Sequence, residues 1–271
     1  MTSVSIKELL EQGVHFGHQA RRWNPKMREY IFETRTGVHI IDLRKTKVLL
    51  EKALDFIQQK VAEGKDIIFV ATKRQCREIV KETAQKMGQH YVTERWLGGT
   101  LTNFRTILSS VRRLEELETI RKEGRAEGRS KKEIAALRRE ETRLHRNLDG
   151  IRGMKEPPGA VVIVDIMKEA NCLKEANRLG VPVVAMVDTS CDPTAVDFLI
   201  PANDDGIKST RLIIVKIGQA VEAGLALRAP KPEEEKKAKK EKVKTAADKE
   251  ESPLPDANEV LEPFVAQEEG S

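Results

Sequence analysis

The chain has 271 residues, of which 34% are charged and 4% aromatic, and its formal net charge is +5 at pH 7. This length allows one large domain or two small ones, and the excess of cations favours polyanionic partners. Cys76, Cys172 and Cys191 form no CxxC pair, and we find neither a secretory leader nor the ~20 apolar residues of a membrane span, so we expect a cytoplasmic protein without a disulfide framework or membrane partner.

Short runs rich in Val and Ile predict the strands of a parallel sheet that helices cover on both faces. These runs are 38–41, 67–70, 161–164 and 183–187, with weaker signals at 91–92 and 198–200. Apolar residues at helical spacing predict helices over 46–61 and 75–87, and a further helix starts near Ile207. The alternation predicts an α/β fold with a doubly wound, mostly parallel sheet over residues 1–101 and 153–228.

Residues 102–152 interrupt this alternation because they contain no strand signal. They read as two long helices, and the second carries the three-four spacing of a coiled-coil seam at Ile134, Leu137, Leu144, Leu148 and Ile151, with Glu141 at the remaining seam position. Residues 123–130 contain two glycines and no large apolar side chain, as expected of a connection between antiparallel helices. We therefore predict an inserted antiparallel coiled-coil hairpin.

The composition changes at residue 229, where prolines and a mixed run of Glu and Lys replace the apolar pattern. A segment this poor in apolar residues cannot build a core. We predict a disordered charged tail over residues 229–271.

The common catalytic signatures are missing from the sequence: there is no phosphate-binding GxxxxGK[ST] loop, GxGxxG, GxSxG or HExxH motif. His15 and His18 could face one metal only in a helix, which Gly13 and Gly17 disfavour. We therefore predict that the chain is not an enzyme.

An acidic group in the C-terminal third is a better candidate for a cation site. It includes Asp188, Asp204 and Asp205, and Asp188 ends a predicted strand, where doubly wound sheets bind ligands. Carboxylate oxygens suit Mg²⁺. We favour the alternative that Asp192 forms a turn and that Asp204 and Asp205 form a turn and cap the helix near Ile207.

Basic residues carry the clearer signal. Around Trp23 the chain combines guanidinium groups, a turn and aromatic rings, and arginine forks match phosphate oxygens while an indole can stack on an unpaired base. A second group opens the helix after the strand 67–70, and a third surrounds a paired glycine and continues into the predicted hairpin. The residues predicted to contact RNA, or to orient residues that do, are Arg21, Arg22, Trp23, Asn24, Lys26, Arg28, Lys73, Arg74, Arg95, Trp96, Arg105, Arg112 and Arg113.

Four long motifs occur in order along the chain. They are GVHFGHQARRWNPKM at 13–27, HIIDLRKT at 39–46, RWLGGTLTNF at 95–104, and VDTSCDP with IPANDDG at 187–206. Together they resemble the bacterial-type small-subunit ribosomal protein S2 family over residues 5–227.

The resemblance implies a Rossmann-like, flavodoxin-type domain with an inserted coiled-coil hairpin. It also implies binding to 16S-type ribosomal RNA at the head–body junction of the small subunit, neighbouring ribosomal proteins as partners, and help in anchoring the messenger-binding protein S1. We expect no required cofactor and no small-molecule substrate. Mg²⁺ or Zn²⁺ at Asp188, Asp204, Asp205 and His18 is the weaker expectation, and a magnesium-dependent enzyme or a coiled-coil protein-interaction module are the alternative functions.

Overall fold

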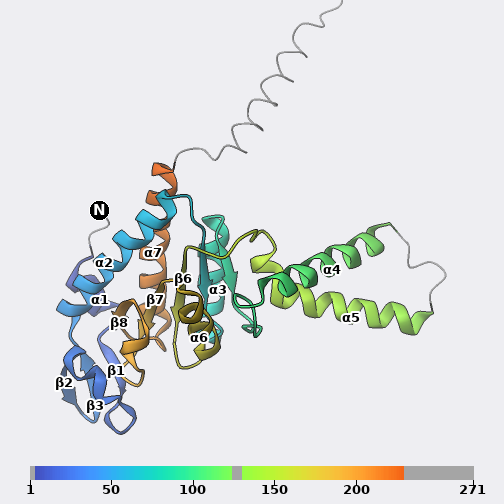
Figure 1. Ribbon diagram of the computed structural model, residues 1–271. Coiled ribbons are helices and arrows are strands. Elements are labelled where there is room, and N and C mark those ends of the chain that lie inside the picture. The colour runs from blue at the N-terminus through green and yellow to red at the C-terminus, as the bar shows by residue number, and fades with distance from the viewer. Residues whose placement is uncertain (1–3, 124–129, 229–271) are drawn as a thin grey trace, which may run out of the picture. The chain divides into compact units, whose positions relative to one another are not determined.

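The computed structural model describes residues 4–123 and 130–228. A five-stranded sheet forms its centre (Figure 1), with strands β4 (Ile67–Val70), β5 (His90–Val92), β6 (Ala160–Val164), β7 (Val183–Val187) and β8 (Phe198–Pro201). All its neighbouring strands are parallel, and their order is β5-β4-β6-β7-β8. This is the 2-1-3-4-5 order of doubly wound sheets. The predicted α/β class with a mostly parallel sheet is confirmed. All six predicted segments form strands, and five of them belong to this sheet.

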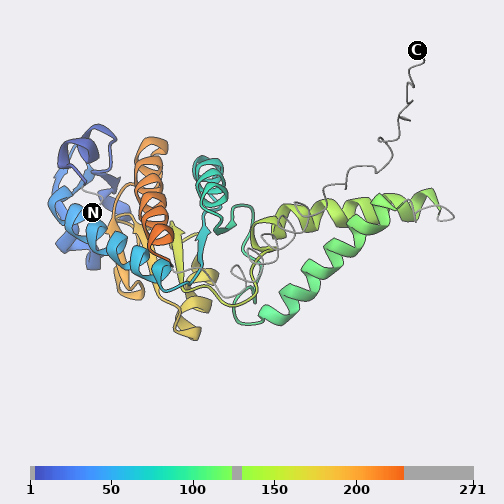
Figure 2. The ribbon, with the colours of Figure 1, turned by 90° about the horizontal axis from the view of Figure 1, so that it is seen from above.

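Helices cover both faces of this sheet because alternate strand residues point to opposite sides. One face packs against α2 (Leu43–Ala62), α3 (Arg74–Lys86) and α7 (Ile207–Leu227), through strand residues such as Phe69 and Val162. The other face packs against α6 (Ala170–Leu179), through residues such as Ile68 and Ile163. Figure 2 shows α3 and α7 on one side of the sheet and α6 on the other.

A second, antiparallel sheet is formed by the N-terminal part of the chain. It contains β1 (Phe16–Gln19), β2 (Ile31–Arg35) and β3 (Val38–Ile41), in the order β1-β3-β2. The prediction that residues 38–41 belong to the parallel sheet is wrong. Thr36 and Gly37 both adopt positive φ, which suits a tight hairpin turn and pairs β3 with β2.

Short elements complete the N-terminal part and the connections. The helix α1 spans Ile6–Glu11, and the 3-10 helices η1 and η2 span Ala20–Arg22 and Pro25–Tyr30. A further 3-10 turn, η4, spans Pro193–Ala195 between β7 and β8. Within the described ranges, no helix has the length and apolar character that crossing a bilayer requires.

Two long helices, α4 (Phe104–Lys122) and α5 (Lys131–Leu148), lie between β5 and β6 in the sequence and pack side by side (Figure 1). Glu141 and Leu148 are buried along α5, as are Val111 and Leu114 along α4. Residues 124–129 lie outside the described residues, as does the segment 229–271. The connection that would complete the hairpin, its boundaries as a domain, and the charged tail therefore stay predictions.

The end of α5 continues into the 3-10 turn η3 (Asp149–Ile151), which packs against β5. A side chain at Gly150 would place its Cβ only 2.0 Å from the carbonyl oxygen of Tyr91. No Cβ fits at that distance without moving the backbone. Glycine at this position lets the base of the helix pair approach the edge strand of the sheet.

Candidate RNA-binding surface

The loops that follow the parallel strands meet at one edge of the sheet, the carboxyl edge. Lys73 and Arg74 follow β4, Arg95 follows β5, Asp165 follows β6 and Asp188 follows β7. Doubly wound sheets bind their ligands at this edge, beside the point where the strand order reverses. Here the reversal lies between β4 and β6.

The N-terminal segment is fastened to the same edge by the loop after β7. The amide of His18 donates to Oγ1 of Thr189 at 2.9 Å, and the amide of Asn24 donates to the carbonyl of Thr189 at 2.8 Å. A Cβ at Gly17 would lie 2.6 Å from Thr189 Cγ2, so this close approach needs a glycine. These contacts bring residues 21–28 beside the sheet edge, although they are more than 160 positions from the loop in the sequence.

Three arginines of this segment keep their charges available. Arg21, Arg22 and Arg28 are exposed, and no carboxylate in the described part of the chain forms an ion pair with them. The only polar side-chain contact found for them there is from Arg21 Nε to Gln19 Oε1, at 2.9 Å. Exposed guanidinium groups without carboxylate partners can bind phosphate oxygens.

The other predicted residues of this segment have structural contacts. Lys26 Nζ lies 2.6 Å from Asp192 Oδ2, and hydrogen bonds from Lys26 and then Thr194 lower the pKa of Asp192 to about 2. Asn24 caps η2 by accepting the amide of Lys26. Trp23 is half-buried, with its ring 5.2 Å from that of His39. For Asn24 and Lys26 the structure favours orientation of the segment over direct contact with RNA.

Two adjacent cations after β4, Lys73 and Arg74, differ in exposure and in pairing. Arg74, the first residue of α3, is exposed, whereas the side chain of Lys73 is only 13% exposed. Lys73 Nζ lies 2.8 Å from a carboxylate oxygen of each of Asp165, Asp204 and Asp205. Burial acts to lower the pKa of Lys73, but these three carboxylates raise it further than burial lowers it. The charge of Lys73 is therefore paired inside the protein, which favours orientation of the loop over direct contact with RNA.

The loop after β5 depends on a residue that sequence reasoning missed. Glu175 of α6 accepts hydrogen bonds from Trp96 Nε1 at 3.0 Å and from the amides of Gly99, Leu101 and Thr102 at 2.8 to 3.1 Å. Trp96 is buried, so its ring belongs to the core and orients the loop. Nothing in the sequence around Glu175 signals this role, because all four donors lie more than 70 positions away.

The remaining predicted cations flank that loop. Arg95 is exposed, as are Arg105 and Arg112 on α4, and within the described ranges none of the three has a carboxylate partner. Arg113 differs, because it is paired with Glu116 and Glu140 at 3.2 Å each. The exposed and unpaired set on the predicted surface is therefore Arg21, Arg22, Arg28, Arg74, Arg95, Arg105 and Arg112.

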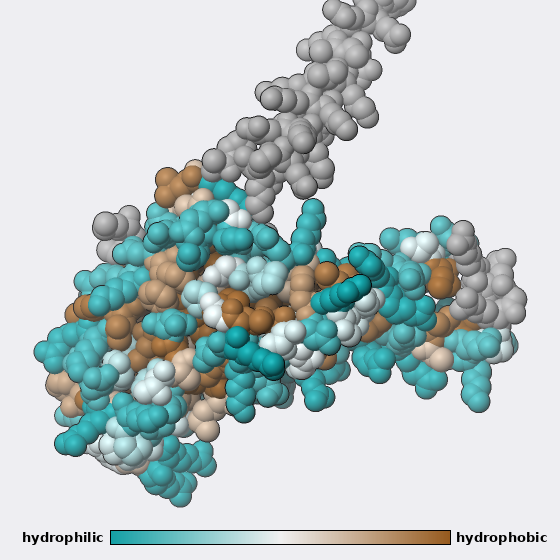
Figure 3. Space-filling model, in the orientation of Figure 1, coloured by the Kyte–Doolittle hydropathy of each residue, from teal (hydrophilic) through white to brown (hydrophobic). Residues whose placement is uncertain are grey.

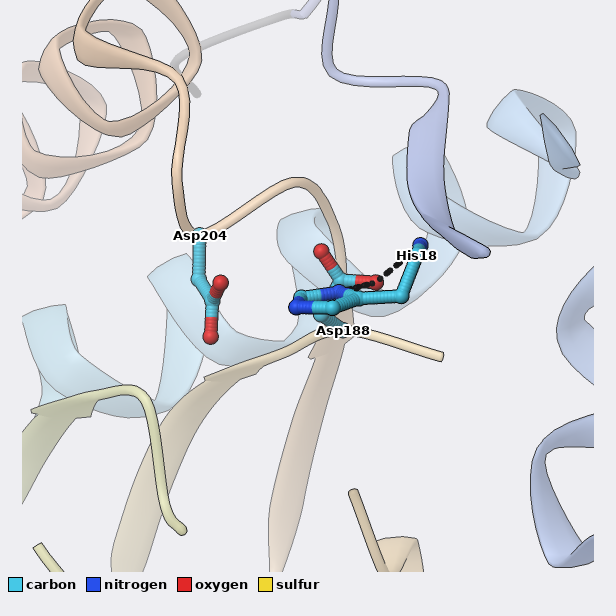
Figure 4. Close-up of side chains that lie close together, drawn as sticks. All are labelled: His18, Asp188 and Asp204. Atoms are coloured by element: carbon cyan, nitrogen blue, oxygen red, sulfur yellow. Dashed lines mark hydrogen bonds and ion pairs between the residues drawn. The ribbon is translucent and has the colours of Figure 1, made fainter. Parts of the chain in front are cut away.

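Beneath this surface lies a buried cluster of carboxylates around His18. Figure 4 shows His18 reaching in from the N-terminal segment toward Asp188 and Asp204, which follow β7 and β8. His18 Nδ1 lies 3.0 Å from Asp188 Oδ1, and this hydrogen bond is the main cause of a raised pKa of His18. Burial, followed by the charge of Asp188, raises the pKa of Asp204 to about 7.

Two sets of side chains in this cluster could hold a cation. His18, Asp188 and Asp204 offer ligand atoms within 4.8 Å of one another, and so do Asp165, Cys191 and Asp204. The first set has the donors that suit Zn²⁺, and its oxygens also suit Mg²⁺. The ammonium group of Lys73 already contacts Asp204, so a metal ion would compete with it. His15 does not join the cluster, because its ring packs on Phe16, with centroids 4.0 Å apart.

The predicted turns and caps at the acidic loop are confirmed in one place and wrong in another. Asp192 caps η4 by accepting the amide of Thr194. The helix α7 has Gly206 at its cap position without a side-chain hydrogen bond, and Asn203 Oδ1 accepts the amides of Asp205 and Gly206 at 3.0 Å. The turn is therefore made by Asn203, because Asp204 and Asp205 point to Lys73 instead.

Comparison with known proteins identifies close relatives. Residues 9–224 match the family model described as ribosomal protein S2. The small ribosomal subunit protein uS2 of Treponema pallidum, in the Nichols strain and in a strain of the subspecies pallidum, is 50% identical over 225 residues, which cover 83% of this chain and 77% of the relative.

The buried cluster predicts a pH dependence of stability. Because the folded-state pKa of Asp204 is raised, the folded chain holds a proton there that the unfolded chain releases near pH 4, so Asp204 costs increasing stability as the pH rises from about 4 to 7. His18, with its raised pKa, stabilises the folded state below pH 6.5, and this contribution is lost above that pH. Both effects lower the stability toward pH 8.

We expect Asp204→Asn to remove part of the loss of stability between pH 5 and pH 8. The free energy of unfolding of the variant minus that of the unsubstituted protein should be larger at pH 8 than at pH 5 by about 1–3 kcal/mol. Urea titrations at both pH values measure this difference. Asp205→Asn is the control, because Lys73 outweighs burial and lowers the pKa of Asp205, so its contribution is constant over this range. Equal behaviour of the two variants would contradict the assignment.

Proposed function

The chain belongs to the ribosomal protein S2 family, and from this membership we propose that its exposed arginines at the carboxyl edge of the sheet bind ribosomal RNA of the small subunit. Family membership makes the chain a structural constituent of the small ribosomal subunit and not an enzyme, as the sequence predicts, and it confirms the predicted location on the ribosome.

One observation carries the RNA-binding proposal. The exposed arginines without carboxylate partners come from separate parts of the sequence, yet the fold gathers Arg21, Arg22, Arg74 and Arg95 at one edge of the sheet. Each phosphate that such a residue neutralises releases counterions, and this release drives binding to RNA. Hydrogen bonds to Glu175 and to Thr189 fix the backbone of the loop after β5 and of the N-terminal segment. The backbone positions of Arg95, Arg21 and Arg22 are therefore set before RNA binds. We place this contact at the head–body junction of the small subunit, with 16S-type RNA.

We also propose that the chain helps to anchor the messenger-binding ribosomal protein S1. The supporting observation is an apolar hollow of about 440 Å³ at the antiparallel sheet, lined by residues that include Leu10, Phe16, Phe32 and Ile40. Phe16 and Phe32 are 50% and 60% exposed. Exposed aromatic side chains around a hollow are typical anchors for a protein partner.

The RNA proposal predicts that Arg21→Gln/Arg22→Gln weakens association with small subunits that lack this protein. Binding measured over a range of salt concentrations should show the slope of log K against log salt reduced by about 1.5 to 2 units, because two phosphate contacts are lost. The matched control is Lys86→Gln/Arg178→Gln, exposed cations at the ends of α3 and α6, which lie toward the opposite edge of the sheet. An unchanged slope in the Arg21/Arg22 variant would refute the proposal.

The S1 proposal predicts that Phe16→Ala/Phe32→Ala leaves incorporation into small subunits unchanged but lowers S1 on the purified particles at least about tenfold, since buried aromatic anchors contribute about 2 kcal/mol or more each. Quantitative mass spectrometry of the particles measures both proteins. Met167→Ala/Leu179→Ala, which truncates exposed apolar residues elsewhere, should retain S1. Normal S1 content in the Phe16/Phe32 variant would exclude this surface as the anchor.

A further inference from the structure

The outer face of α5 carries a stripe of cations that is set by the period of the helix. At 3.6 residues per turn, Lys132, Arg139, Arg143 and Arg146 fall on one narrow face. Residues of the helix-pairing seam, such as Leu137, Glu141 and Leu148, fall on the opposite face. All four cations are exposed. The stripe therefore points away from α4.

Two carboxylates of α5 form ion pairs with arginines of α4, so they do not neutralise this stripe. Glu140 pairs with Arg113 at 3.2 Å, and Glu141 pairs with Arg121 at 3.0 Å. Glu133 is directed to the start of the helix, where it forms a capping box with Ser130. The three acidic residues of α5 thus have partners away from the stripe.

The stripe itself contains no acidic residue. Between its cations on the same face lie only Ala135 and Ala136. In the described part of the chain, Lys132, Arg139 and Arg143 have no carboxylate partner, and Arg146 is tied to Glu94 at 3.3 Å. The stripe extends over about 21 Å from Lys132 to Arg146, at about 1.5 Å per residue. On the face that Figure 3 shows, the surface over α4 and α5 is mainly hydrophilic.

We propose that the outer face of α5 is a second RNA-binding surface, on which Lys132, Arg139 and Arg143 bind phosphates along an RNA backbone. The guanidinium groups of Arg139 and Arg143 match the oxygens of a phosphate bidentately, and the ammonium group of Lys132 binds a phosphate as a point charge. Protein interfaces, in contrast, are built around aromatic or apolar anchors, and the stripe offers only alanines. The inference rests on the proposed function, because it assigns further contacts to the same RNA-binding role.

This face was not evident from the sequence, in which the hairpin cations predicted to bind were Arg105, Arg112 and Arg113. Of these, Arg113 proves to be neutralised by Glu116 and Glu140. The cations of α5 are interspersed with Glu133, Glu140 and Glu141 along the chain, so they read as an ordinary mixed-charge helix. Only the contacts between α4 and α5 show which cations have a carboxylate partner and which do not.

The test is the variant Lys132→Gln/Arg139→Gln/Arg143→Gln, in which glutamine keeps a similar helix propensity. Its association with small subunits that lack this protein is measured over a range of salt concentrations. We expect the slope of log K against log salt to fall by about 2 to 3 units, with the thermal unfolding midpoint unchanged. The matched control, Lys52→Gln/Lys86→Gln/Arg178→Gln, removes the same charge from exposed positions outside α5 and should retain the slope.

A photo-cross-linker attached at Arg143→Cys identifies the partner in the assembled subunit. Cross-links to ribosomal RNA support the proposal, whereas cross-links to protein alone, or none to RNA, overturn it. If the stripe variant keeps the full slope while the Arg21/Arg22 variant loses part of it, the inference about α5 fails and the proposed function stands. If neither variant loses slope, both fail.

Discussion

Internal pairing of carboxylates with cations determines which positive charges this protein presents to a partner. Charged groups taken out of water are costly unless they are paired, and several buried or partly buried carboxylates of this protein hold a nearby cation. Asp165, Asp204 and Asp205 commit Lys73, and Glu140 and Glu141 commit Arg113 and Arg121. Among the residues predicted to contact RNA, the exposed cations left without a carboxylate partner in the described ranges are all arginines. A modest net charge of +5 is thereby distributed as locally strong positive surfaces.

The place where doubly wound sheets usually bind a small ligand is filled here by the chain's own side chains. Lys73 lies beside the point where the strand order reverses and is held by three carboxylates. Asp165 adopts φ of 66°, a conformation rare outside glycine, and its carboxylate caps the backbone that follows. This edge of the sheet therefore has a structural role, which fits a structural member of the ribosomal protein S2 family.

Much of the fold could be predicted from the sequence because the buried strands are continuous apolar runs and their connecting helices are amphipathic. Residues 38–41 were misassigned because a four-residue apolar run does not reveal which sheet it joins, and β1 and β2 are too polar to be noticed. The site could be predicted only as a set of candidate residues. Lys73 and Arg74 are adjacent residues of like charge, and the sequence does not show that only Lys73 is neutralised. Two of the carboxylates that pair with Lys73 lie 131 and 132 positions further along the chain.

The salt dependence with which the unsubstituted protein binds small subunits that lack it tests the central claim most directly. If arginines without internal partners bind RNA phosphates, log K should fall linearly with log salt, with a slope of at least about 4 units, because several phosphate contacts each contribute up to 0.9. A slope near zero, with binding that survives nuclease treatment of the subunits, would contradict the account.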